Sequence, residues 1–428
     1  MNNFLAHDEE TRQEMLKSIS MKSIDELFKE IPQKAKMSSL NLPDALSEMQ
    51  VQREIKSISK KNKNDLISFV GAGVYNHFIP AAISQVAQRF EFLTAYTPYQ
   101  PEISQGTLQI MYEFQSLICN LTGMDVSNAS VYDGATACAE AILMAVRISK
   151  REKVLVSEAL NPEYKKVIET YAWANSIEIE YFPVKEFKTD FNIEARLKTG
   201  EYACILAQNP NFFGTIEDIN LKSVLEETKT LLAICVDVSS LSILKAPLEY
   251  GADIVIGDIQ PLGIPMSFGG PHAGFMACKE KFMRQLPGRI AGKTLDKDGN
   301  TAFTLTIQTR EQHIKREKAT SNICSNQALI ALCATLYLSL MGEEGFRQVG
   351  LISSKNAHDL SKMLAEKGVK TLNNDFYSEF VIEVENANEF LNDLKQKGIA
   401  GGIKLDETKI LISTTELHTQ DDLNLYVG

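Results

Sequence analysis

The feature that most constrains the fold is an alternation of short apolar segments with amphipathic ones between residues 153 and 278. The apolar segments are continuous and rich in β-branched residues, which is typical of strands buried on both faces of a parallel sheet. Apolar residues at helical spacing mark the segments between them. The alternation predicts an α/β domain with a mostly parallel sheet and helices on both faces. The expected strands are 154–156, 177–182, 203–207, 231–236, 254–256 and 272–278, and the expected helices between them include 162–174 and 221–228.

Ligands of such sheets bind at the carboxyl ends of the strands, where residues 209–214, Asp237 and the Gly/Pro-rich passage after 254–256 are expected. In pyridoxal phosphate enzymes a strand and loop of this kind carry the lysine that forms the Schiff base, and an aspartate on an earlier strand holds the pyridine nitrogen. Asp237 is the candidate aspartate, but no lysine lies between Lys245 and Lys279. The stretch therefore predicts a cofactor site that this chain cannot complete.

Glycines and small residues mark two further candidates for anion binding. Residues 133–136, Asp-Gly-Ala-Thr, open an expected helix at 137–148, and the free N–H groups of such a helix start can bind a phosphate. The simpler interpretation is that Asp133 caps this helix. Gly71 and Gly73 do not make a dinucleotide-binding loop, because no third glycine opens a helix at the required spacing.

The most unusual loop covers residues 94–106 and contains two tyrosines, two prolines, two glutamines and a glutamate. A long aromatic and polar loop of this kind is usually functional or packed against a partner. The alternative is an ordinary surface connection. Ser104 is placed to cap the helix that follows, in which apolar residues from Leu108 to Leu121 recur at helical spacing.

The two ends of the chain differ in character from its middle. The first forty residues are polar and helical by pattern, and 43–60 is an expected amphipathic helix with Leu46, Met49 and Ile55 facing inward. An apolar helix at 324–341 ends at Gly342. Beyond it, helices at 346–366 and 387–397 alternate with strands at 380–384 and 410–413, which indicates a small α+β domain. The expected domains are 1–65, 66–342 and 343–428.

Composition excludes several classes of protein. The net charge of −11 argues against nucleic acid or an anionic membrane as a partner, because either favours a basic surface. No apolar run of membrane-spanning length and no signal-peptide pattern is present, so a cytoplasmic protein is expected. The seven cysteines are scattered without CxxC or Cys/His ligand spacing, which favours buried reduced thiols and no metal.

Six motifs together resemble one family, glycine decarboxylase, the P-protein of the glycine cleavage system. They are TAYTPYQPEISQG (94–106), VYDGATACAEA (131–141), QNPNFFG (208–214), FGGPHAGF (268–275), QTREQHIKREKATSNIC (308–324) and ISTTELHTQDDL (412–423), and they span nearly the whole chain. Some members of this family are single chains of two similar halves, and others are divided into two subunits. This chain resembles the first subunit, and the position matching the family's Schiff-base lysine falls on Gln260.

The resemblance implies a pyridoxal-phosphate-dependent transferase fold of the aspartate aminotransferase type, with the small α+β domain at its C-terminus. It implies that glycine is decarboxylated on pyridoxal phosphate held covalently by a lysine-bearing second subunit, in a heterotetramer with two copies of each. The aminomethyl group then passes to the lipoyl arm of the H-protein. No catalytic residue is expected in this chain alone. The alternatives are a self-sufficient pyridoxal phosphate aminotransferase and a non-catalytic scaffold or regulatory homologue.

Enzymes of this fold place their sites at a subunit interface, so the resemblance also implies residues lent to the partner's cofactor. Thr320 and Ser321, expected to open the helix 324–341, are candidates for binding its phosphate, and simple helix capping is the alternative. Tyr96, Tyr99 and Glu102 on the aromatic loop are candidates for facing the cofactor. His272, His313 and Arg310 lie in motifs, with structural hydrogen bonding and catalysis both open for each.

Overall fold

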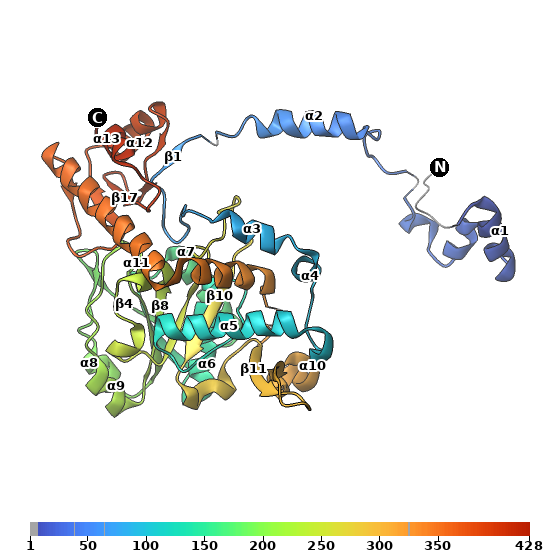
Figure 1. The fold of residues 1–428 in the computed structure, drawn as a ribbon, viewed down its shortest axis with the longest axis horizontal. Coiled ribbons are helices and arrows are strands. Elements are labelled where there is room, and N and C mark those ends of the chain that lie inside the picture. Colours follow the sequence, from blue (N-terminus) through green and yellow to red (C-terminus); the bar gives the residue numbers. More distant parts are fainter. Residues whose placement is uncertain (1–6, 38, 64, 324–325) are drawn as a thin grey trace. The chain divides into compact units, whose positions relative to one another are not determined.

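The computed structural model describes residues 7–37, 39–63, 65–323 and 326–428. The chain divides into two units, Met1–Asn64 and Asp65–Gly428 (Figure 1). The first unit contains α1 (Glu9–Ser18), the 3-10 turns η1 (Ile24–Phe28) and η2 (Gln33–Ala35), and α2 (Glu48–Ser59). Leu16 is its only buried residue among those described, so this unit has almost no core of its own.

Helix α2 starts later than the expected helix 43–60. Ser47 is its N-cap, and a reciprocal capping box with Gln50 satisfies the first turn, which leaves Pro43 outside the helix. The prediction that Leu46, Met49 and Ile55 face inward is wrong: these side chains are 48, 58 and 59% exposed. The prediction of a helix here is confirmed, but its apolar side chains have no core within their own unit to pack against.

The second unit is built on a seven-stranded sheet in the order β2-β10-β9-β8-β7-β3-β4. Its strands are β2 (Val126–Ser127), β3 (Lys153–Ser157), β4 (Glu178–Phe182), β7 (Tyr202–Gln208), β8 (Leu231–Asp237), β9 (Ile254–Asp258) and β10 (Gly274–Cys278). The run from β9 to β4 is parallel throughout, and β10 pairs antiparallel with both of its neighbours. All the strands predicted between residues 153 and 278 are confirmed, with shifts of one or two residues at their ends.

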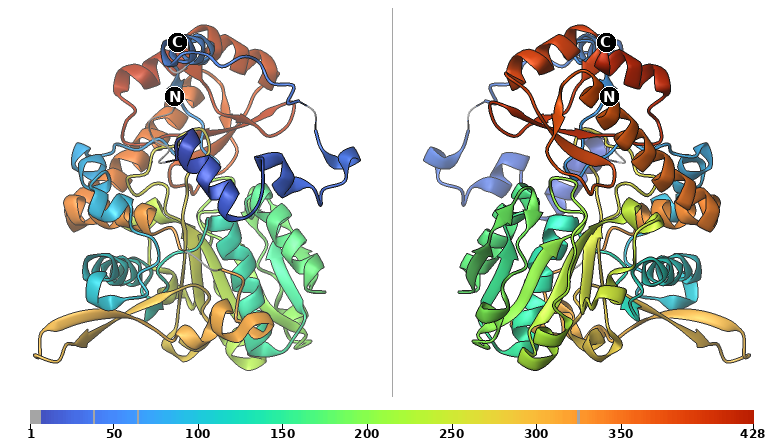
Figure 2. Two further views of the ribbon diagram at one scale, coloured as in Figure 1. Left: turned by 90° about the vertical axis from the view of Figure 1, so that its right-hand side faces the viewer. Right: turned by 90° about the vertical axis from the view of Figure 1, so that its left-hand side faces the viewer.

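Helices cover both faces of this sheet, as the two views of Figure 2 show. One face packs with α5 (Gln105–Thr122), and the other with α6 (Gly134–Ser149) and α7 (Pro162–Ala174). Alternate residues of one strand enter opposite cores: Leu155 packs in the first, and Val154 and Val156 in the second. Burial on both faces is the reason that the strands are continuously apolar.

Shorter elements connect and flank this framework. The helical ones are α3 (Ala81–Ala87), α4 (Phe90–Leu93), η3 (Pro101–Ile103), α8 (Glu194–Leu197), α9 (Lys222–Thr228), η4 (Val238–Ser242), η5 (Pro247–Tyr250), η6 (Glu280–Gln285), η7 (Gln308–Arg310), α10 (Gln312–Lys315) and η8 (Arg316–Lys318). Two hairpins were not predicted: β5 (Val184–Lys185) with β6 (Lys188–Thr189), and β11 (Ile290–Leu295) with β12 (Thr301–Thr306). Ser104 is the N-cap residue of α5, but its side chain makes no capping bond.

Helix α11 (Ala328–Glu366) covers the predicted helix 324–341 from residue 328 on and all of the predicted helix 346–366, with a break at Gly342, whose φ of 60° and ψ of −176° are not helical. The prediction that Thr320 and Ser321 open this helix is wrong, because α11 begins at Ala328. The chain before it is held elsewhere: the Asn326 side chain donates to the Ala129 carbonyl, and the Gln327 N–H donates to Ser130 Oγ. Cys324, the predicted first residue, lies outside the described residues.

By length and composition α11 could span a membrane, but it packs on α5 and α3.

A second, antiparallel sheet follows in the order β13-β14-β17-β16, formed by Lys370–Thr371, Glu379–Glu383, Lys409–Ser413 and Ile403–Lys404. It packs with α12 (Ala387–Gln396) and α13 (Gln420–Val427) around a core of its own that includes Phe380, Ile412 and Tyr426. Phe69 joins this core, and β1 (Ile67–Ser68) pairs with β15 (Ile399–Ala400). The small α+β region is thus present, while the boundary at residue 343 stays a prediction, since α11 runs through it.

Candidate functional site

The candidate site lies at the carboxyl ends of β8 and β9. These strands are parallel neighbours, and Asp237 and Asp258, their last residues, are paired in register. Gln260 follows two residues later. The structure therefore brings Asp237 and Gln260 to one edge of the sheet, as ligand binding in this class of fold requires.

Gln260 is 1% exposed, and both ends of its side-chain amide are engaged. Its Oε1 accepts the Tyr75 N–H at 2.8 Å, and its Nε2 donates to the carbonyls of Tyr75 at 2.8 Å and Ile264 at 2.9 Å. An amide can donate and accept at once, whereas a lysine ammonium only donates. Gln260 is thus a structural cross-link between the segment around Tyr75 and the loop after β9.

Asp237 lies close to a second buried carboxyl, that of Glu379. Its carboxylate accepts hydrogen bonds from the N–H and hydroxyl of Ser239, and burial raises its pKa. Nearby, Glu379 of β14 accepts from the Ala72 N–H at 2.6 Å and from the Tyr75 hydroxyl at 2.8 Å. Burial raises the pKa of Glu379 to about 7. The hydrogen bonds of Glu379 join the small sheet to the segment 72–75.

The N-terminus of α6 is occupied by carboxylates of the chain itself. Asp133 accepts the Thr136 N–H at 2.7 Å, so the capping interpretation of this helix start is confirmed. The Gly134 N–H donates to Asp258 Oδ2 at 3.0 Å, and His272 Nδ1 lies 3.3 Å from the same oxygen. The hydrogen bond to Asp258 raises the pKa of His272. The observed role of His272 is therefore a hydrogen bond to Asp258.

Little space remains between these groups. The cavity that Asp237 and Asp258 line together with Tyr164 has a volume of about 20 Å³, and the one between Asp237 and Glu379 about 10 Å³. Such volumes hold about one water molecule each. Pyridoxal phosphate does not fit at this edge: the Gln260 side chain is bonded within the chain, the Gly134 N–H is bound to Asp258, and the cavities are too small for a ring.

A second group of polar side chains lies apart from that edge and is called here the polar cluster: Tyr99, Arg289, Glu311 and His313. Arg289 donates to the Tyr99 hydroxyl at 3.2 Å, with its guanidinium 5.3 Å from the centre of the ring. Arg289 and His313 each lie 3.6 Å from Glu311 Oε2. The Arg289 side chain is 3% exposed, whereas Tyr99 is 49% exposed.

Three more predicted residues adjoin the polar cluster. Thr320, Ser321 and Arg310 line a cavity of about 10 Å³ together with Glu311. The Thr320 N–H donates to the Arg310 carbonyl, and the Ser321 hydroxyl donates to Glu140 Oε1 at 2.7 Å. Arg310 is held by the carbonyls of Ile307 and Gly288. Hydrogen bonds within the chain thus hold the segment from Arg310 to Ser321 in place.

The predicted residues therefore divide into groups. Tyr99, His313, Arg310, Thr320 and Ser321 come together, whereas His272 belongs to the Asp258 site and Tyr96 and Glu102 are exposed. Sequence reasoning missed Glu311, which lies within the motif 308–324, and Asp258, which ends a predicted strand. It also missed Arg289, which follows Pro287 and Gly288 outside the quoted motifs, so no local signal marked it.

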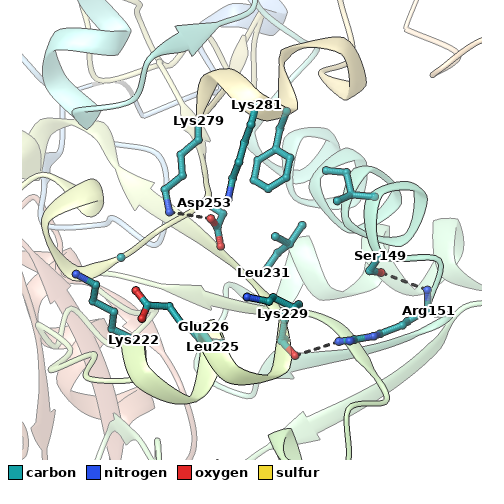
Figure 3. Close-up of a pocket in the computed structure, with 14 residues that line it drawn as sticks. Ser149, Arg151, Lys222, Leu225, Glu226, Lys229, Leu231, Asp253, Lys279 and Lys281 are labelled. Carbon is teal, nitrogen blue, oxygen red and sulfur yellow. Dashed lines mark hydrogen bonds and ion pairs between the residues drawn. The ribbon is translucent and has the colours of Figure 1, made fainter.

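One of the largest cavities, about 520 Å³, lies at the opposite, amino ends of the strands (Figure 3). Leu225 and Leu231 form part of its wall, and an ion pair between Lys279 and Asp253 of 2.8 Å crosses one side. None of the predicted site residues lines it. Among the described residues, no group of three or more His, Cys, Asp or Glu side chains is placed to hold a metal ion.

The mostly parallel sheet, its helices on both faces and the small C-terminal sheet define the class: the fold of pyridoxal-phosphate-dependent enzymes of the aspartate aminotransferase type. A solved Lactobacillus brevis glutamate decarboxylase has this fold, with a TM-score of 0.67, 13% identity, and coverage of 94% of this chain and 96% of that chain. At that identity the likeness concerns the fold alone.

The particular family follows from closer matches. The family described as glycine cleavage system P-protein matches residues 2–427, and this chain belongs to it. A crystal structure of glycine decarboxylase (P-protein) of the glycine cleavage system, in inhibitor-bound form, has a TM-score of 0.92 and 39% identity, covering 99% of this chain and 98% of that one.

Its curated relatives are named probable glycine dehydrogenase (decarboxylating) subunit 1. That of Geobacillus thermodenitrificans is 44% identical over 100% of this chain and 98% of the relative. That of Desulforamulus reducens is 47% identical over 94% and 92%. The chain is thus a component of glycine dehydrogenase (decarboxylating), of the subunit 1 kind, as the motifs predicted.

Proposed function

We propose that this chain is the lysine-free subunit of a heteromeric glycine dehydrogenase and completes the active site of a lysine-bearing second subunit. The observation that carries the proposal is the bonding of Gln260: the residue at the lysine position is buried and makes three hydrogen bonds within the chain. A chain whose own site is closed in this way contributes to the reaction through another surface. This argues against a self-sufficient aminotransferase.

The polar cluster and its neighbours Thr320, Ser321 and Arg310 are the proposed contribution. Pyridoxal phosphate, held covalently by the partner, supplies the electron sink for loss of the glycine carboxylate. From this chain, Thr320 offers its hydroxyl and the cationic side chains of Arg289 and Arg310 supply positive charge, both of which suit a phosphate. The Ser321 hydroxyl already donates to Glu140 and accepts the Ile323 N–H, so it has no proton left for a phosphate.

Exposed apolar side chains support an interface beside the polar cluster. Between residues 78 and 103 they are Phe78, Phe90, Leu93, Tyr96, Tyr99 and Ile103, which are 57, 74, 53, 82, 49 and 82% exposed. An apolar series of this size on a water-soluble surface usually marks a binding site. We place the second subunit there, with Glu102 at its rim, in a heterotetramer of two copies of each chain.

The remaining expectations from the resemblance belong to the same proposal. The aminomethyl group passes to the lipoyl arm of the H-protein, glycine is the substrate, and the complex is cytoplasmic. Neither nucleic acid nor a membrane is a partner, in keeping with the net charge of −11.

Reconstitution tests the proposal. The purified chain with pyridoxal phosphate should show no internal-aldimine absorbance and no glycine-dependent release of carbon dioxide, and both should appear when the lysine-bearing partner is added. Borohydride reduction followed by peptide mapping identifies the modified lysine. Cofactor trapped on a specific lysine of this chain would refute the proposal.

A further inference from the structure

The start of α6 is covered by two side chains from different elements. Asp258 ends β9 and accepts the Gly134 N–H, and Tyr164 lies on α7. A β-carbon at Gly134 would lie 2.5 Å from the Tyr164 hydroxyl and 3.1 Å from Asp258 Cβ. The glycine is therefore required because these two side chains already pack against the helix start.

The charges at this place disfavour a second anion. Asp258 and Asp133 both bind N–H groups of the first turn of α6, so a phosphate arriving there would meet two carboxylates in place of free donors. His272 Nδ1 lies 3.3 Å from Asp258 Oδ2 and compensates part of this charge when the imidazole is protonated. Burial and the charge of Asp258 raise the pKa of Tyr164, which keeps its phenol neutral.

The space between Asp237 and the start of α6 is also filled. Tyr164, Asp237 and Asp258 line the same cavity of about 20 Å³, so Tyr164 occupies the volume between the candidate ring-binding aspartate and the helix. Loss of the lysine alone would leave an open pocket able to bind the cofactor without a covalent bond. The structure shows no such pocket at this place.

We infer that Asp258 and Tyr164 are a built-in replacement for the cofactor: the carboxylate takes the position of an anion at the start of α6, and the phenol fills the adjoining space. This inference rests on the proposed function and goes further, because it says that the chain's own site excludes pyridoxal phosphate by occupancy as well as by lack of a lysine.

Pyridoxamine 5′-phosphate is the discriminating probe, since it carries the ring and phosphate but needs no lysine. Titrated by calorimetry into the full wild-type chain without partner, it should show no saturable binding up to millimolar concentration. The double variant Asp258→Ser, Tyr164→Ala should bind it at least tenfold more tightly than that limit. Asp253→Ser, one residue before the amino end of β9, is the control and should behave as the wild type.

Saturable binding of one equivalent to the wild-type chain would overturn the inference, as would a folded double variant that gains no binding. If the double variant does not fold, Asp258→Asn keeps an acceptor for Gly134 but removes the charge. The pKa of His272, followed by NMR, should then fall, and an unchanged titration would also overturn the inference. Because these tests use the chain alone, they are independent of whether the reconstituted complex releases carbon dioxide.

Discussion

The Gln260 region and the polar cluster are both groups of polar residues in the same unit, yet they are bonded in opposite ways. Gln260 is 1% exposed and its donors and acceptor are matched by backbone groups of its own chain. In the polar cluster Tyr99 is 49% exposed, and buried Arg289 leaves its Nε without a hydrogen bond among the described residues. The Gln260 side chain has all its hydrogen bonds within the single chain. The polar cluster keeps a hydrogen-bond donor, Arg289 Nε, that has no partner among the described residues.

The difference has a physical basis. Buried polar groups must be paired during folding of the chain, because an unpaired one costs about 1–3 kcal/mol. Groups at an interface are paired only on assembly, so before it they remain partly exposed or incompletely bonded. We therefore expect the Gln260 region to stabilise the folded chain and the polar cluster to act in the proposed contact with the second subunit. The following predictions test it.

The largest effect is expected from Gln260→Lys. The ammonium cannot accept the buried Tyr75 N–H, and burial of its charge costs further free energy, so the free energy of unfolding should fall by about 3 kcal/mol or more. Urea denaturation measures it, with the exposed Gln312→Lys as control. The variant alone should not catalyse glycine-dependent exchange of labelled bicarbonate. Unchanged stability would show that the amide network is dispensable.

Glu379→Gln should alter the pH dependence of stability. The pKa of Glu379 is raised from 4.5 to about 7 in the folded chain, so its contribution to stability is fully present below pH 4.5 and is lost as the pH rises to about 7. The loss amounts to about 3 kcal/mol at 1.36 kcal/mol per pKa unit. The difference in unfolding free energy between pH 4.5 and pH 7.5 should therefore be smaller in the variant. Parallel profiles for both proteins would contradict the assignment.

Thr320→Val tests the residues beside the polar cluster. If its hydroxyl binds the partner's cofactor phosphate, its loss should cost about 1.5–2 kcal/mol and weaken cofactor retention by the heteromer roughly tenfold or more, with assembly intact. Adding Ser321→Ala should not increase the effect, because the Ser321 hydroxyl already donates to Glu140. Titration of pyridoxal phosphate into each heteromer gives the affinities, and Thr301→Val, exposed on β12, is the control. Equal affinities would mean that Thr320 serves only its own loop.

The smallest effect is expected from Tyr96→Ser. Since this side chain is 82% exposed, the stability of the chain alone should change by less than about 0.5 kcal/mol. The affinity for the second subunit should fall about fivefold, which corresponds to about 1 kcal/mol. Trp173→Ser is the matched control, because Trp173 is 83% exposed on α7, away from the aromatic loop in the chain. Equal weakening by both variants would remove the basis for placing the interface at residues 78–103.

The sequence by itself determined the main-sheet strands between residues 153 and 278, the class of fold, the family and the absence of a lysine near Gln260, because periodicity and motifs are properties of neighbouring residues. The pairing of Gln260 with Tyr75, 185 residues away in the chain, could not be read from it. Nor could the contact of Asp258 with Gly134, or the assembly of Tyr99 with Arg289 and His313. The start of α11 was misplaced for the same reason: residues 326 and 327 bond to Ala129 and Ser130, which local propensity does not register. Contacts between distant segments compete with local preferences, and only the tertiary structure decides which of them prevail.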